Sequence, residues 1–233
     1  MCKKEDIYMD IKGAIFDMDG TLVDSLSFWE YFYKAVGVKY GVGEDFCPDE
    51  SVERIIRTST FKQGMALMHR ACGIGNSADE LENDAITICA DFYKKIVTVK
   101  DGVLEFLEYC LDKGVKMCVA SATQKDLLNI VVERFGFDRY FSAVISCGDI
   151  GKGKEHPDVF LAALEHLGTP IESTYVFEDS VVAVETAVKA GFGTVGIYDK
   201  YGFGHDRIKS LATEYIGQGE TMMKLMKGTN DCV

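Results

Sequence analysis

The chain has 233 residues, of which 47% are hydrophobic and 27% charged, so it can form one large domain, or one domain that carries a smaller insert. Its 25 basic and 37 acidic residues give a formal charge of −12, which opposes nonspecific binding to nucleic acid or to an anionic membrane. We therefore expect a small molecule as the partner, with no nucleic acid and no membrane.

The first apolar run, residues 14–16, predicts a short buried strand that is followed at once by Asp17, Asp19 and Gly20. Ligands collect beyond the carboxyl ends of strands in an open parallel sheet, and a turn at Gly20 lets both carboxylates approach one substrate group. Two close carboxylates favour a cation between them or protonation of one. Either arrangement suits phosphoryl transfer, in which one carboxylate attacks phosphorus and the other exchanges protons. The alternative is an acidic turn that caps a helix.

Residues 26–98 have helical periodicity almost throughout and contain no convincing strand. Aromatic and aliphatic side chains recur at helical spacing, which is typical of the inner faces of a small bundle. These side chains are Phe28, Trp29, Phe32, Tyr33, Ile55, Ile56, Met65, Leu67, Met68, Ile86, Ile88, Phe92 and Tyr93. We predict an inserted helical domain over 26–98, hinges near 24–27 and 97–101, and a core domain made of 1–25 and 99–233.

Beyond the insert, short apolar runs alternate with longer segments of helical periodicity. The predicted strands are 117–120, 143–146, 175–177 and 194–197. The predicted helices, each followed closely by a glycine suited to a C-terminal cap, are 103–113, 125–135, 158–167 and 182–190. This alternation predicts an α/β fold, with a Rossmann-like parallel sheet flanked by helices and the helical domain inserted as a cap.

Polar residues with possible roles in phosphate binding follow the second strand and precede a later helix. Ser121, with the backbone amide of Ala122, is suited to hold phosphate oxygens, although serine is also a common helix cap. Lys154 lies in the loop before helix 158–167, where it would neutralise carboxylate and phosphate charge. Lys152 is a competing candidate, and an exposed loop lysine is the commoner case.

A second acidic pair, Glu178 and Asp179, follows the strand 175–177. Two acids at this strand end, in a sheet that already carries two others, make a credible Mg²⁺ site, because that ion prefers oxygen ligands and keeps water molecules for the substrate to replace. A helix N-cap is the alternative for Asp179, but it explains one residue and not the whole set.

These four motifs, beginning with Asp-x-Asp-Gly-Thr at Asp17, resemble those of the haloacid dehalogenase superfamily in their order and separations, and the likeness covers nearly the whole chain. The helical insert stands where that family places its cap. The resemblance implies that Asp17 is a nucleophile that forms an aspartyl-phosphate and that Asp19 is the general acid and base. It also implies that Ser121, Ala122 and Lys154 bind the transferring phosphoryl group.

The resemblance further implies a Mg²⁺ cofactor held by the Asp17 side chain, the main-chain carbonyl of Asp19, and Asp179. Glu178 would be a further ligand, either directly or through water. Dehalogenation is disfavoured, because dehalogenases of this superfamily generally lack the second aspartate and the magnesium. The function that we predict is hydrolysis of a small phosphorylated metabolite, such as a sugar phosphate.

Three alternative functions stay open. A sugar phosphomutase similar to β-phosphoglucomutase would fit residues 120–123, but such mutases carry a histidine twelve residues after the nucleophile, where this chain has Trp29. Phosphonoacetaldehyde hydrolase would need a cap lysine, and no cap lysine has a distinctive context. A phosphate-binding protein without catalysis would not need a nucleophile beside a general acid.

The cap residues expected to contact the rest of the substrate are Trp29, Arg54, Arg57 and Lys62, together with the turn at 73–76. For each basic residue a solvated helix face is the commoner role. His69, the sole histidine of the cap, is expected to be a half-buried surface residue.

The eight cysteines are irregularly spaced, without a CxxC pair, so we expect free thiols. Residues 1–10 lack the apolar stretch of a signal peptide, and no later segment resembles a membrane span. We expect a cytoplasmic monomer.

Overall fold

Within residues 9–226, which the computed structural model describes, six parallel strands form one sheet with the order β3-β2-β1-β4-β5-β6. The strands are β1 (Gly13–Phe16), β2 (Lys116–Ser121), β3 (Val144–Ser146), β4 (Thr174–Glu178), β5 (Gly193–Ile197) and β6 (Glu214–Ile216). The predicted Rossmann-like α/β fold is confirmed, and each of the five predicted strands is present.

The central strand β1 is buried along its whole length and pairs with β2 on one side and β4 on the other. A parallel strand covered on both faces reads as an unbroken apolar run, which is why residues 14–16 were recognisable. The edge strand β6 was not predicted, because its three residues include the half-buried Glu214 and Tyr215 and form no apolar run. Because β1 pairs in parallel with both β2 and β4, the carboxyl ends of these three strands lie at the same edge of the sheet.

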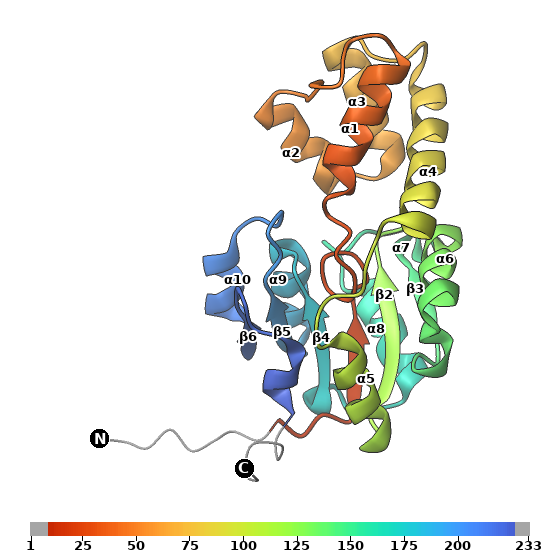
Figure 1. Cartoon of the computed structure of the whole chain (residues 1–233). Coiled ribbons are helices and arrows are strands. Elements are labelled where there is room, and N and C mark those ends of the chain that lie inside the picture. Colours follow the sequence, from red (N-terminus) through yellow and green to blue (C-terminus); the bar gives the residue numbers. More distant parts are fainter. Residues whose placement is uncertain (1–8, 227–233) are drawn as a thin grey trace.

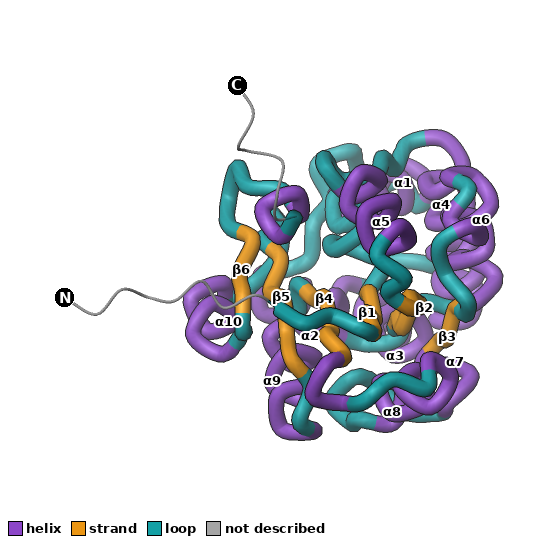
Figure 2. The backbone as a smooth tube through the Cα atoms, turned by 90° about the horizontal axis from the view of Figure 1, so that it is seen from below, coloured by secondary structure: helices purple, strands orange, loops and turns teal. Residues whose placement is uncertain are grey.

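Helices cover both faces of the sheet, as Figure 2 shows. The helices α5 (Val103–Asp112) and α6 (Lys125–Phe135) lie on one face, and α8 (Asp158–Leu167) and α9 (Val181–Ala190) lie on the other. Alternate residues of β1 serve the two layers, since Phe16 packs with Phe106 of α5 while Ile15 packs with Phe160 of α8. The four predicted helices agree with these bounds to within one residue. The short helices α7 (Cys147–Ile150) and α10 (His205–Leu211) were not predicted.

The insert forms four helices that stand beyond one end of the sheet (Figure 1). They are α1 (Phe28–Lys39), α2 (Glu50–Thr58), α3 (Phe61–Cys72) and α4 (Ala78–Lys95). Their inner faces contain most of the predicted apolar side chains, including Phe32, Met65 and Phe92, which are almost fully buried. Ile55 was wrongly predicted to be part of this interior: it is 54% exposed, because its neighbour Ile56 occupies the inward face of α2.

Two further observations concern the described part of the chain. Its six cysteines, Cys47, Cys72, Cys89, Cys110, Cys118 and Cys147, are free thiols, whereas Cys2 and Cys232 lie outside the described residues. Between residues 9 and 226, no helix combines the length and the apolar character that a membrane crossing requires. Most of the N-terminal segment 1–10, in which no signal peptide was predicted, lies outside the described residues.

Candidate active site

A tight loop after β1 carries Asp17 and Asp19 to the carboxyl edge of the sheet. The amide of Asp17 donates to the carbonyl of Phe177 in β4 at 3.0 Å, which continues the strand pairing up to the acidic residue. Gly20 then turns the chain with a φ of 78°. A Cβ atom at this position would lie 2.5 Å from Oδ2 of Asp179, so the loop and the second acidic pair approach each other closely only because residue 20 is glycine.

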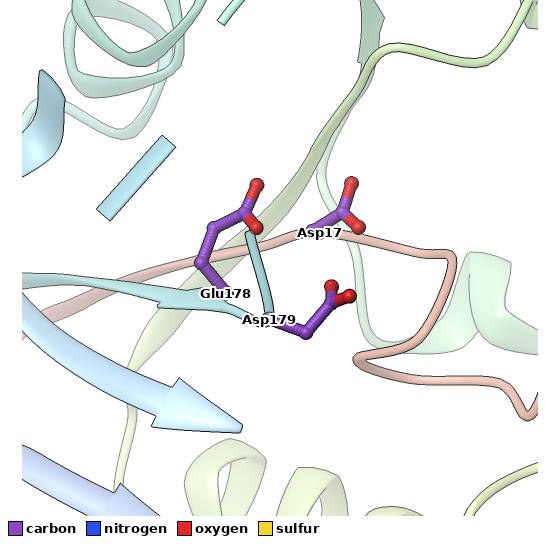
Figure 3. A group of neighbouring side chains, drawn as sticks. All are labelled: Asp17, Glu178 and Asp179. Carbon is purple, nitrogen blue, oxygen red and sulfur yellow. The ribbon is translucent and has the colours of Figure 1, made fainter. Parts of the chain in front are cut away.

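Three carboxylates from the neighbouring strands β1 and β4 converge at this edge (Figure 3). The side chains of Asp17, Glu178 and Asp179 are buried, and their ligand oxygens all lie within 4.8 Å of one another. The hydroxyl of Thr21 donates to Oδ1 of Asp179 at 3.1 Å and fixes its orientation.

Lys154 supplies a positive charge inside this cluster. Its ammonium group binds Oδ1 of Asp17 and Oε1 of Glu178, and its side chain is 10% exposed. Lys152, the competing candidate, instead pairs with Asp158 at 2.7 Å and has a side chain that is 51% exposed. Of these two lysines, Lys154 is the one that lies among the carboxylates.

Burial and mutual repulsion make these carboxylates harder to ionise. Burial raises the pKa of Asp17 to about 7, with Lys154 opposing the shift and Glu178 adding to it. Burial also raises the pKa of Asp179 well above its usual range, and the charges of Glu178 and Asp17 add to that shift. Although burial lowers the pKa of Lys154, attraction to Asp17 and Glu178 raises it overall, so this side chain is protonated.

One lysine does not balance three buried carboxylates, so a divalent cation fits this cluster on charge as well as on geometry. Oxygen ligands on adjacent strand ends are the donor set that Mg²⁺ prefers. These three side chains could therefore hold a metal ion.

Asp19 has different surroundings from Asp17. Its Oδ1 accepts hydrogen bonds from Ser25 at 2.7 Å and from the hydroxyl of Tyr93, and its Oδ2 accepts one from Thr123 at 2.7 Å. Sequence reasoning missed all three donors. Ser25 and Thr123 lie inside segments that carry motif residues, but nothing in the sequence showed that Tyr93, 74 positions from Asp19, would reach it.

The predicted phosphate-binding serine lies at the end of β2. Ser121 is 1% exposed, and its hydroxyl accepts a hydrogen bond from the amide of Thr123 at 3.2 Å. Ala122 follows directly and is exposed. Because β2 pairs with β1, this loop shares the sheet edge with Asp17.

Trp29 lies inside the cap, whereas the two predicted arginines contact the core. Trp29 is 9% exposed and packs against Phe61 and its own helix within the cap interior. Arg57 donates to the carbonyl of Tyr201 at 2.6 Å, and Arg57 and Arg54 both face the ring of Phe203. These arginines thus contact the core segment that follows β5.

Lys62, the remaining basic candidate, and the cap histidine His69 lie elsewhere on α3. Lys62 is exposed on α3. His69 is half-buried, as expected, with Nδ1 2.9 Å from the carbonyl of Ile74.

The family model and the named relatives indicate the same family of hydrolases. The model of the family described as haloacid dehalogenase-like hydrolase matches residues 14–197. A protein of Thermotoga maritima named phosphorylated carbohydrates phosphatase is 28% identical over 182 residues, which cover 78% of this chain and 82% of that protein. Validoxylamine A 7'-phosphate phosphatase of Streptomyces hygroscopicus subsp. limoneus is 27% identical over 190 residues, covering 80% and 85% of the two chains.

Solved structures show the same fold. A Thermotoga maritima protein provisionally assigned as a β-phosphoglucomutase has a TM-score of 0.73 and 25% identity, covering 88% of this chain and 94% of that one. CbbY from Rhodobacter sphaeroides, solved with phosphate, has a TM-score of 0.75 and 19% identity, covering 88% and 93%.

Proposed function

The chain belongs to the haloacid dehalogenase-like hydrolase family, and on that premise we propose that it is a Mg²⁺-dependent phosphatase of a small phosphorylated metabolite, such as a sugar phosphate. The observation that carries this proposal is the buried group of Asp17, Lys154, Glu178 and Asp179 at one sheet edge. Relatives named as phosphatases of phosphorylated carbohydrates and of validoxylamine A 7'-phosphate support the substrate class.

The chemistry that we assign to the site has two steps. The carboxylate of Asp17 attacks phosphorus, the bond from phosphorus to the substrate oxygen breaks, and Asp19 gives that oxygen a proton. Asp19 then takes a proton from water as this water attacks the aspartyl-phosphate, which releases phosphate and restores Asp17. Ser121, the amide of Ala122, and Lys154 hold the phosphoryl oxygens throughout.

The proposal also includes a bound metal ion. We assign its ligands as the carboxylates of Asp17 and Asp179, the main-chain carbonyl of Asp19, and Glu178 either directly or through water. Bound Mg²⁺ supplies positive charge to the phosphoryl oxygens and lowers the repulsion between the carboxylates and the substrate.

The cap, which we take as residues 26–98 on a core of 1–25 and 99–233, is proposed to cover the site and select the substrate. The contact of Arg57 with Tyr201 supports a cap seated on the core, where it keeps bulk water from the aspartyl-phosphate. The free cysteines of the described residues support a reducing compartment such as the cytoplasm, and we propose that the protein acts there as a monomer.

A sugar phosphomutase is the second candidate. It is favoured by the similarity to the Thermotoga maritima structure that is provisionally assigned as a β-phosphoglucomutase. Trp29 disfavours it. This side chain is buried against Phe61 and offers no imidazole at the position where the mutases carry histidine.

The proposal is tested by measuring phosphate release from sugar phosphates, nucleotides and small acid phosphates with Mg²⁺ and with EDTA. A parallel assay follows conversion of β-glucose 1-phosphate to glucose 6-phosphate. We expect Mg²⁺-dependent phosphate release without isomerisation; isomerisation without phosphate release would overturn the assignment. Two lysines of one loop provide a matched pair, in which Lys154→Met should lose activity and Lys152→Met should keep it.

A further inference from the structure

Three hydroxyl groups hold the carboxylate of Asp19, and they come from three separate parts of the chain. Ser25 lies just before the cap, Thr123 lies in the loop after β2, and Tyr93 lies in the last turns of the cap helix α4. Both oxygens of Asp19 have a partner, so the carboxylate cannot rotate without breaking a hydrogen bond.

Tyr93 is itself fixed in place. Its side chain is 3% exposed, and its main-chain carbonyl accepts a hydrogen bond from Arg134 of the core helix α6. This contact anchors the end of α4 on the core. Burial and the adjacent Asp19 charge raise the pKa of Tyr93 well above its usual range, so its hydroxyl remains a donor under assay conditions.

The orientation of Asp19 matters for the reaction proposed above. Thr123, which holds Oδ2, is two residues from Ser121, so the carboxylate is tied to the loop that we assign to phosphate binding. A general acid is effective only when it lies within hydrogen-bonding reach of the oxygen that it protonates.

We infer that Tyr93 is a positioning residue for Asp19, which makes the general acid dependent on the seating of α4 against the core. This inference rests on the proposed function. It adds that the cap contributes to the chemical step through one hydroxyl, besides any contact that it makes with the substrate.

The way in which the rate depends on the leaving group distinguishes a positioning role of Tyr93 from a purely structural one. An alkoxide leaving from a sugar phosphate needs a proton from Asp19, whereas nitrophenolate leaves without one. A poorly oriented Asp19 therefore slows formation of the aspartyl-phosphate from an alkyl ester and leaves its formation from an aryl ester nearly unchanged. A general loss of stability or of metal binding would lower both rates.

The chain offers a matched control for this test. Tyr33 in α1 is also a buried cap tyrosine, 3% exposed, but its hydroxyl has no hydrogen-bond partner among the described residues. Tyr93→Phe and Tyr33→Phe therefore remove the same atom, once with and once without a contact to Asp19.

The experiment compares kcat/KM for p-nitrophenyl phosphate and for the best sugar phosphate, with saturating Mg²⁺. We expect Tyr93→Phe to lower the value for the sugar phosphate about tenfold and that for the aryl ester less than about twofold. Tyr33→Phe should change neither. Equal losses with the two substrates, no loss, or a gain would overturn the inference.

Two further variants separate the possible failures. If Asp19→Asn retains the sugar phosphate activity, the proposed role of Asp19 fails; if Asp19→Asn loses it while Tyr93→Phe does not, only the inference about Tyr93 fails. Should Tyr93→Phe not fold, Arg134→Met keeps the tyrosine but frees its carbonyl from α6. It should show a smaller loss confined to the sugar phosphate, and an unchanged ratio of the two kcat/KM values would overturn the inference.

Discussion

Replacement of Asp17 by asparagine removes a carboxylate that the fold buries beside Glu178 and Asp179. We expect Asp17→Asn to abolish phosphatase activity and yet to unfold with a larger free energy than wild type in EDTA at neutral pH. The reason is that folding transfers the Asp17 charge out of water and places it near the charges of Glu178 and Asp19, with Lys154 offsetting the cost only in part.

The magnitude follows from the pKa of Asp17, which rises from its ordinary value of 3.8 to about 7 on folding. A shift of about three units corresponds to about 4 kcal/mol, an upper limit because the variant also removes one partner of Lys154. A raised pKa means that the folded protein binds the proton more tightly than the unfolded chain does. Wild-type stability is therefore complete below the unfolded value and falls as pH rises from 3.8 toward about 7.

Asparagine cannot ionise. The difference in free energy of unfolding between the variant and wild type should therefore be small near pH 4 and reach its full size above about pH 7. Urea unfolding followed by circular dichroism, in EDTA at about pH 4 and about pH 8, measures this difference. Asp112→Asn, an exposed position on α5, is the control for loss of a carboxylate outside the site. Millimolar Mg²⁺ should stabilise wild type more than Asp17→Asn. A variant that is no more stable than wild type at the higher pH, or that is equally more stable at both, would refute this reasoning.

Three other substitutions test the geometry of the site. Gly20→Ala places a Cβ atom 2.5 Å from Oδ2 of Asp179 and strains a φ of 78°. A titration should therefore show a higher Mg²⁺ concentration for half activity, and a thermal melt should show a loss of about 1–2 kcal/mol in the free energy of unfolding. Thr21→Val removes the hydrogen bond to Asp179 and should raise the Mg²⁺ concentration for half activity about tenfold or more. Arg57→Met cuts the contact with the carbonyl of Tyr201, so limited proteolysis of the cap hinges should become severalfold faster.

The part of the site that lies next to strands could be predicted from short stretches of sequence. The acids at 17, 178 and 179 and Ser121 each follow or end an apolar run, and parallel strands bring their carboxyl ends together at one edge. No knowledge of long-range contacts was needed for this step, because the sheet itself assembles the residues.

The contacts made by the cap could not be predicted in the same way. Tyr93 was visible only as a member of a helical stripe, and Arg57 only as a basic residue of the cap expected to contact the substrate. Their partners lie 74 and 144 positions away. Those pairings depend on how α2 and α4 sit against the core, which helical periodicity does not determine. The choice of Lys154 over Lys152 likewise depended on the path of one loop, since the two side chains differ by only two positions.

The central claim is that Asp17 is the residue that receives the phosphoryl group. Asp19→Asn, mixed with p-nitrophenyl phosphate and Mg²⁺ and then quenched in acid, should accumulate the covalent intermediate, because the aryl group leaves without a proton while water lacks its base. Mass spectrometry of the peptides should find phosphate on the fragment that contains Asp17. Phosphate on another residue, or release of nitrophenol with no phosphorylated peptide at any quench time, would contradict the account.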